Sequence, residues 1–349
     1  MSDLRSHLLA GHAIPAQPLA LDAQRRFSPR HQRAITRYYL AAGVGGLAVG
    51  VHSTQFEIRD PKHGLFEPVL ELAAETIAAD LAAHPRPFIK IAGACGRTAQ
   101  AVREAEIAAG FGYDAVLLSL AAWRDDDEAA IIAHCRAVAA VRPLIGFYLQ
   151  PAVGGRVLSR TFWREFAAIP EVLAVKIAPF NRYQTLDVVR GVIEAGRDDV
   201  ALYTGNDDTI VTDLLTPFTF DHEGRAVTRR IVGGLLGHWG VWTHAAVNLQ
   251  GELAAAARED TFSAAWLATA AAVTDMNAAL FDAAHQFHGC IPGILEVLRR
   301  QGLAETNLCL NPHETLSPGQ AEELTRVSLA YPFLTDDDFV ARHRDAWLA

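Results

Sequence analysis

Lys176, in the segment VLAVKIAPF, is a candidate nucleophile. It stands near the end of an apolar run that we expect to be buried on both faces. Burying an unpaired ammonium group is costly, so burial lowers the pKa of a lysine and leaves more of it as neutral amine. A neutral amine can attack a carbonyl carbon and form a Schiff base. The alternative is a lysine at a strand end whose ammonium group lies in solvent or pairs with a carboxylate.

Lysine is rare in this chain, which has only Lys62, Lys90 and Lys176 among 31 lysines and arginines. Because arginine carries most of the positive charge, each lysine merits separate consideration. Lys90, in PFIKIAGACG, lies in an apolar run much like the run around Lys176. The local pattern therefore does not choose between these two lysines.

Tyr148, in LIGFYLQPAVGG, ends the apolar run that precedes the run of Lys176. In a barrel of parallel strands, the carboxyl ends of neighbouring strands converge on one mouth, where active sites form. Imine formation needs a proton shuttle beside the amine, and a phenol with a lowered pKa can serve. The alternative is a core aromatic whose hydroxyl bonds to backbone. The pair favours Schiff-base chemistry more strongly than either residue alone.

A strand–helix repeat must position these residues. Eight short apolar runs alternate with amphipathic stretches rich in Ala, Leu and Glu, which predicts a closed (β/α)8 TIM barrel. An open doubly wound sheet is the alternative, but the sequence lacks both glycine-rich phosphate-binding patterns of nucleotide-binding sheets. The expected strands are residues 13–20, 46–51, 88–92, 115–118, 144–148, 173–177, 201–204 and 240–243.

The chain divides into two expected parts. Residues 1–250 form the barrel, and residues 251–349 form a C-terminal helical extension packed on it. Residues 218–236 are an expected insertion before the eighth strand. A central HEGR turn flanked by Thr and Val predicts that this insertion is a hairpin or a lid.

Composition excludes several classes of function. A net charge of −9 argues against a nucleic-acid-binding surface. No apolar stretch approaches the ~20 residues that span a bilayer, so no membrane partner is expected. The four cysteines have no CxxC spacing, and no signal-peptide pattern is present, which predicts a cytoplasmic protein with reduced thiols. We expect no cofactor.

The order of features resembles the dihydrodipicolinate synthase and N-acetylneuraminate lyase family of class I aldolases. The matching segments are LAVGVHST, IAGACGRTAQAV, YLQPAVGG, AVKIAP and YTGNDD, and the resemblance covers roughly residues 12–320. It implies Lys176 as the Schiff-base lysine, Tyr148 as the proton shuttle and a pyruvate-like 2-keto acid as the substrate. It also implies a homo-oligomer, a tetramer or a dimer.

Departures from the family pattern narrow the expected function. The loop expected to bind the substrate carboxylate has His52 where a threonine is usual, followed by Ser53 and Thr54. Residues 119–123 lack the Tyr-Tyr pair of dihydrodipicolinate synthases, and Val153 stands where they carry an arginine. The chain is therefore expected to be a related lyase rather than dihydrodipicolinate synthase itself.

Further candidate substrate contacts lie after the last two expected strands. Gly205 opens the YTGNDD turn, and Trp242 and His244 follow in GVWTHAAVN. Trp242 is expected to narrow the pocket or stack on a flat substrate group, with core packing as the alternative. His52, His238 and His244 raise the possibility of a metal-dependent hydrolase, but the first strand has no His-x-His pair, so no metal is expected. A barrel that binds a small metabolite without turnover remains the second hypothesis.

Overall fold

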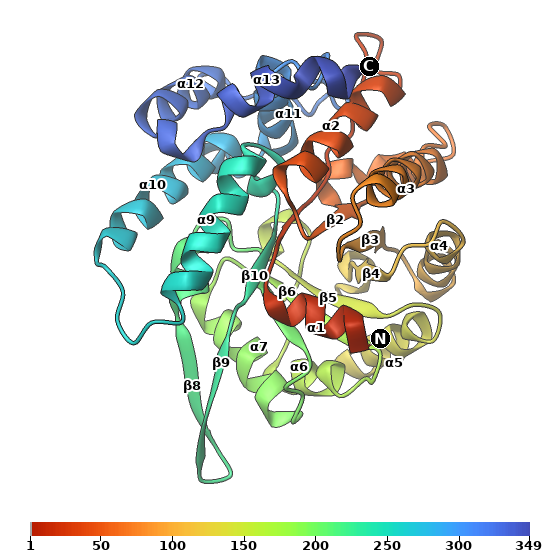
Figure 1. The fold of residues 1–349 in the computed structure, drawn as a ribbon. Coiled ribbons are helices and arrows are strands. Elements are labelled where there is room, and N and C mark those ends of the chain that lie inside the picture. The colour runs from red at the N-terminus through yellow and green to blue at the C-terminus, as the bar shows by residue number, and fades with distance from the viewer. Residues whose placement is uncertain (1) are drawn as a thin grey trace.

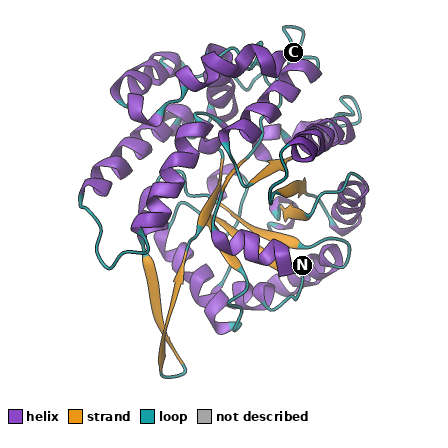
Figure 2. Ribbon diagram, viewed as in Figure 1, coloured by secondary structure: helices purple, strands orange, loops and turns teal. Residues whose placement is uncertain are grey.

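The computed structural model describes residues 2–349 and consists of one parallel barrel with flanking helices (Figure 1 and Figure 2). The strands are hydrogen-bonded in the order β1-β10-β7-β6-β5-β4-β3-β2, and a bridge between Ala16 and Ala48 closes the ring. The (β/α)8 barrel is therefore confirmed, and the open sheet is wrong. The barrel strands are β1 (Ala13–Pro15), β2 (Gly46–Val49), β3 (Ile89–Ala94), β4 (Ala115–Leu118), β5 (Leu144–Leu149), β6 (Val172–Ala178), β7 (Ala201–Thr204) and β10 (Gly233–Leu236).

Helices surround the barrel and continue beyond it. Those of the barrel layer are α2 (Pro29–Ala42), α3 (Phe66–Ala83), α4 (Thr98–Gly110), α5 (Glu128–Ala139), α6 (Arg160–Ala167), α7 (Arg182–Glu194), α8 (Ile210–Leu215) and α9 (Thr243–Ala256). The others are α1 (Ser2–Ala10), α10 (Ala265–Leu280), α11 (Cys290–Arg300), α12 (Gln320–Ala330) and α13 (Asp337–Leu348). None of these helices is long and apolar enough to span a bilayer.

Alternation along the strands divides the core into two layers. Inward-pointing side chains such as Ile91 and Phe147 form one buried cluster inside the barrel, whereas outward-pointing ones such as Tyr148 and Ile177 form a second cluster against the helices. Successive strand residues point to opposite faces, so a change of register by one residue exchanges these two environments.

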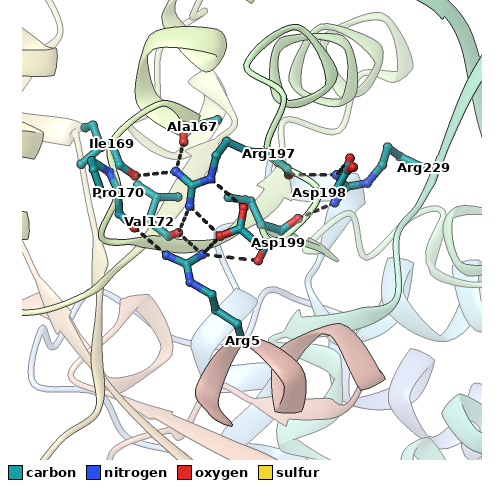
Figure 3. Close-up of polar contacts among 10 residues, drawn as sticks. Arg5, Ala167, Ile169, Pro170, Val172, Arg197, Asp198, Asp199 and Arg229 are labelled. Carbon is teal, nitrogen blue, oxygen red and sulfur yellow. Dashed lines mark hydrogen bonds and ion pairs between the residues drawn. The ribbon is translucent and has the colours of Figure 1, made fainter. Parts of the chain in front are cut away.

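Helix α1 closes the amino end of the barrel. Leu8 packs in the interior cluster, and its carbonyl accepts a hydrogen bond from the Tyr203 hydroxyl at 2.8 Å. Arg5 donates to the carbonyls of residues 170 and 172 and pairs with Asp199, which Arg197 also binds (Figure 3). This end is therefore sealed by apolar packing and by arginines that satisfy backbone carbonyls.

The predicted insertion is a hairpin but not a lid. β8 (Pro217–His222) pairs antiparallel with β9 (Arg225–Arg230), and Phe220 lies under the guanidinium of Arg190 on α7. The tip of the hairpin projects away from the barrel and away from helices α11–α13 (Figure 1). The expected eighth strand at residues 240–243 is wrong, because the strand is β10, which lies inside the range assigned to the insertion.

The C-terminal helices pack on the barrel layer, beside α2 and α9. The Tyr38 hydroxyl on α2 donates to Asp336 at 2.6 Å, and the Arg37 guanidinium donates to the carbonyl of Trp347 at 2.7 Å. Helix α9 runs continuously through residue 250, where the boundary between barrel and extension was expected. The extension is thus tied to the barrel by buried polar contacts as well as apolar ones.

Candidate active site

A cavity of about 80 Å3 lies at the carboxyl end of the barrel, opposite to the end that α1 seals. Its wall comes from the ends of β5 and β6, the loops after β2 and β7, and the C-terminal segment. The lining residues are Ala16, Val51, His52, Ser53, Phe147, Leu149, Gln150, Val153, Lys176, Ala178, Phe180, Gly205, Asp207, Gly237, Phe281, Phe287, Cys290 and Ile294. Active sites of barrel enzymes form at this end, where several strands and loops converge.

Lys176 lies in this wall. It is the fifth residue of β6, pairs in register with Phe147 and Tyr203 of the neighbouring strands, and points into the barrel. Lys176 is only 9% exposed, and its Nζ lies 4.5 Å from the centroid of the Phe147 ring. Burial lowers the pKa of Lys176, and the negative charge of Asp207 opposes this shift in part. The expected burial and lowered pKa are therefore both present.

Asp207 shares the cavity with Lys176 and was not predicted as a site residue. It follows β7, and its carboxylate accepts the backbone N–H of His238 at 3.3 Å. Burial raises the pKa of Asp207, and the positive charge of Lys176 opposes that rise. The sequence GNDD, directly after β7, was the signal that could have identified Asp207 as a site residue.

Gly205 lets the backbone approach the lysine closely. A Cβ added at this position would lie 2.7 Å from Cε of Lys176 and 2.8 Å from Cβ of Ala178. Gly205 also lines the cavity. Its absent side chain leaves the space that the lysine stem occupies.

Tyr148 does not lie beside Lys176, so the predicted pairing of phenol and amine is wrong. Its hydroxyl accepts the N–H of Leu158 at 3.2 Å and contacts that residue's carbonyl at 3.4 Å, and its ring packs on Trp163 of α6. Burial raises the pKa of Tyr148, the reverse of what a proton shuttle needs. Tyr148 is therefore in the alternative environment considered for it, that of a core aromatic side chain whose hydroxyl bonds to backbone.

A register shift between β5 and β6 explains the misplacement. Leu144 pairs with Val172, but the next residue, Ile145, pairs with Ala174, so β6 contains one extra residue. Without that bulge the register would place Tyr148 opposite Lys176; with it, Phe147 takes this place. A one-residue shift turns a side chain to the other face of the sheet.

The loop after β2 places two of its three predicted residues in the wall. His52 and Ser53 line the cavity, whereas Thr54 does not. Burial and the charge of Lys176 lower the pKa of His52 to about 4, so its ring is neutral at physiological pH. Both hydroxyls face backbone: Ser53 donates to the carbonyl of Ala16 at 2.9 Å, and Thr54 donates to that of Gln17 at 2.7 Å.

Trp242 and His244 are not in the cavity wall, which corrects the prediction that both lie at the mouth. Because the eighth strand ends at Leu236, residue 242 caps α9 and residue 244 lies within it. Trp242 is buried beside His238, with ring centroids 6.0 Å apart. The His244 ring stacks on the Phe339 ring of α13, with centroids 4.2 Å apart. It therefore packs against the C-terminal extension.

Residues after α10 complete the wall. Phe281, Phe287 and Cys290 come from this segment, and the Phe287 ring meets Phe180 edge-on at 5.9 Å. Phe180 and Phe287 have positive φ angles of 52° and 66°. Backbone strain of this kind concentrates at functional sites, where surrounding contacts maintain it.

Within residues 2–349, no group of three His, Cys, Asp or Glu side chains could hold a metal ion. The three histidines of the metal hypothesis are separated: His52 is in the cavity wall, His238 bonds to Asn277, and His244 stacks on Phe339. The arrangement that remains is a buried amine and a buried carboxyl group in one apolar cavity. Such a pair supports attack on a carbonyl carbon with acid–base assistance.

Barrel and cavity together place the chain in the class of α/β barrels with a lysine at the carboxyl mouth. No protein-family model and no curated protein matches the sequence. Solved structures do match. Dihydrodipicolinate synthase from Acinetobacter baumannii, complexed with pyruvate, has a TM-score of 0.74 at 16% identity, with 93% of this chain and 99% of that chain covered.

Two other solved structures agree with this result. N-acetylneuraminate lyase from Fusobacterium nucleatum gives a TM-score of 0.69 at 15% identity, with 93% of this chain and 99% of that chain covered. Dihydrodipicolinate synthase from Agrobacterium tumefaciens gives a TM-score of 0.71 at 18% identity, with 94% of this chain and 99% of that chain covered. At these identities the similarity establishes a shared fold over nearly the whole chain.

Proposed function

We propose that this chain is a Schiff-base-forming lyase or aldolase, a divergent relative of dihydrodipicolinate synthase and N-acetylneuraminate lyase, in which Lys176 captures a carbonyl substrate. The observation that carries the proposal is the burial of the Lys176 amine at the carboxyl mouth, with its pKa lowered. The shared fold supports the same class of chemistry. Pyruvate, bound in the A. baumannii structure, and other 2-keto acids are the first compounds to test.

Lys176 acts on the substrate as a neutral amine. Its nitrogen forms a bond to the carbonyl carbon, and loss of water from the carbinolamine leaves an iminium ion. The iminium ion withdraws electrons, so a carbon–carbon bond next to it can break or form. The lowered pKa of Lys176 raises the fraction of amine that is ready for attack at neutral pH.

Asp207 takes the role of the acid–base group that Tyr148 does not fill. Burial raises the pKa of Asp207, so part of its population carries a proton at neutral pH. A protonated carboxyl group can protonate the departing hydroxyl of the carbinolamine, and the resulting carboxylate can accept a proton in the reverse step. Lys176 and Asp207 line the same cavity, which supports this assignment.

Reductive trapping tests the proposal. The protein is incubated with pyruvate, or with a panel of ketones and aldehydes, and cyanoborohydride, and the adduct is located by peptide mass spectrometry. A single adduct on Lys176 is expected. Lys62 and Lys90 serve as internal controls, because the chain has no other lysine. An adduct that forms first on Lys90, or on no lysine with any carbonyl compound, contradicts the proposal.

A barrel that binds a small metabolite without turnover is the second candidate function. The observation that favours it is the Tyr148 hydroxyl, which bonds to Leu158 instead of facing the cavity. Ligand binding that survives Lys176→Ala, with no trapped adduct in the unaltered protein, would support this candidate. Isothermal calorimetry on the two proteins separates the cases, since an imine contributes to affinity only when the amine is present.

A further inference from the structure

The cavity wall contains no fixed positive charge apart from the nucleophile. Across residues 2–349 no arginine lines it, and its ionisable groups are Lys176, Asp207, His52 and Cys290. His52 is neutral at physiological pH, because burial lowers its pKa to about 4. Burial also keeps Cys290 protonated, since it raises the pKa of that thiol well above its usual range. In the remaining pair, the carboxylate form of Asp207 offsets the charge of the ammonium form of Lys176.

A guanidinium close in sequence to the wall is engaged elsewhere. Arg156 follows the wall residue Val153 by three positions, yet its Nη1 donates to the carbonyls of Trp123 and Asp126 at 2.7 and 2.6 Å. A guanidinium held by two backbone carbonyls is oriented toward them and not toward a substrate anion. Val153 itself presents an aliphatic side chain to the cavity.

The hydroxyl groups of the loop after β2 are engaged as well. Each hydroxyl has a single proton to donate. The proton of Ser53 goes to the carbonyl of Ala16, and that of Thr54 goes to the carbonyl of Gln17. Neither hydroxyl can therefore donate to a substrate carboxylate without giving up a buried hydrogen bond, which costs free energy.

Apart from the amide of Gln150, the rest of the wall is apolar, and the space is small. Phe147, Phe180, Phe281 and Phe287 contribute aromatic rings, and the cavity holds about 80 Å3. A carboxylate in such surroundings lies beside the carboxyl group of Asp207 and meets no fixed cation, which disfavours it.

We infer that the carbonyl compound captured by Lys176 is a small uncharged aldehyde or ketone and not a 2-keto acid anion. This inference rests on the proposed function. The carbonyl carbon forms a bond to the lysine nitrogen, and the carbonyl oxygen leaves as water with two protons from the amine, relayed through Asp207. No oxidant or reductant is needed. The aromatic wall then surrounds the substituents of the imine carbon.

Pyruvate and pyruvamide form a matched pair of probes, because they differ only in the charged or neutral group next to the ketone. Initial rates of cyanoborohydride trapping on Lys176 are measured for both by peptide mass spectrometry. Each rate is divided by the rate of the same compound with Nα-acetyl-lysine, which removes the difference in intrinsic reactivity. The normalised rate with pyruvamide is expected to exceed that with pyruvate by about tenfold or more.

The outcomes separate this inference from the proposed function. Preference for pyruvamide supports the inference. Equal labelling, or preference for pyruvate, overturns it and leaves Lys176 as the nucleophile. If neither compound, nor acetone or hydroxyacetone, labels Lys176 in protein with an unchanged circular dichroism spectrum, both the inference and the proposed function are wrong.

Val153→Arg tests whether the missing cation is the cause. An arginine at this wall position supplies the positive charge that a carboxylate needs, so the normalised rate with pyruvate is expected to rise relative to pyruvamide. Val157→Arg is the matched control, because Val157 is 59% exposed and outside the wall. An unchanged ratio in Val153→Arg, with the protein folded, counts against the inference.

Discussion

Two lysines of this chain lie in the same tripeptide, Lys-Ile-Ala, on two strands of one barrel, and their surroundings differ in both end and face. Lys90 is the second residue of β3, near the amino end, and points outward, where a Cβ on Gly112 would lie 3.3 Å from its Nζ. Lys176 is the fifth residue of β6, near the carboxyl end, and points inward. Of these two lysines, only Lys176 lines the cavity.

The comparison shows that strand end and strand face decide which of two locally equivalent lysines can be a nucleophile. The inward residues near the amino end lie under α1, where apolar side chains pack together and the arginines of Figure 3 bind backbone carbonyls. At the carboxyl end the loops form the wall, and burial lowers the pKa of Lys176. Nothing in the tripeptide itself encodes this difference.

Substitution of Lys176 should have the largest effect on imine trapping, and substitution of Lys90 is its control. Lys176→Met removes the amine but keeps an apolar chain of similar length, so imine trapping and any turnover should fall by at least ~10³-fold. Its free energy of unfolding should be unchanged or higher, because a costly buried amine is gone. Lys90→Met should retain the trapping rate at residue 176. A large loss of trapping in Lys90→Met would break the comparison.

Asp207→Asn should have the next largest effect, on both rate and pH dependence. If Asp207 protonates the carbinolamine, the maximal trapping rate falls by about 10²–10⁴-fold. Trapping needs the neutral amine, so its rate rises with pH to a plateau above the pKa of Lys176. The Asp207 carboxylate raises that pKa, so its removal lowers the pKa and moves the midpoint of the pH profile to lower pH.

The two effects of Asp207→Asn have different causes and are read separately. A shifted midpoint with an unchanged plateau would mean that Asp207 only sets the charge balance of Lys176. A lower plateau would place it in proton transfer. A profile that does not change in either respect would remove Asp207 from the site.

The fold was largely predictable from the sequence, because the strand–helix repeat is local. Seven of the eight strands overlap their expected ranges. The eighth was misplaced because Gly233 and Gly234 suggest a turn, whereas the apolar run Gly240–Thr243 suggests a strand. Close tertiary packing explains why the strand contains glycine: a Cβ on Gly234 would lie 2.6–2.7 Å from the side chains of Leu236 and Trp239. Local composition does not reveal such a requirement.

The candidate site was only partly predictable. Four of the predicted residues, Lys176, Gly205, His52 and Ser53, line the cavity. Tyr148 does not, because the bulge that sets its register depends on pairing between β5 and β6. The phenylalanines near residues 281–287 come from a segment about a hundred residues after β6, and no local pattern connects that segment with the barrel mouth.

Gly205→Ala should have an intermediate effect, because the new Cβ would overlap the lysine stem at 2.7 Å from Cε. Displacing a reacting group by about 1 Å costs up to ~10²-fold in rate, and overpacking costs about 1–3 kcal/mol of stability. Gly251→Ala on α9 is the matched control, since its Cβ would meet nothing within 4 Å. That variant should keep the trapping rate and gain ~0.5–1 kcal/mol in chemical denaturation.

Tyr148→Phe should have the smallest effect on chemistry. The substitution removes a hydroxyl that accepts the N–H of Leu158 and leaves that buried donor unpaired, which costs about 1–3 kcal/mol of stability. The trapping rate on Lys176 should change by less than about twofold, whereas loss of a proton shuttle would reduce it by about 10²–10⁴-fold. Trapping kinetics and urea denaturation of one variant therefore distinguish a residue of the outer layer from one of the cavity. A large kinetic loss without destabilisation would return Tyr148 to the site and require the pairing of β5 with β6 to differ in solution.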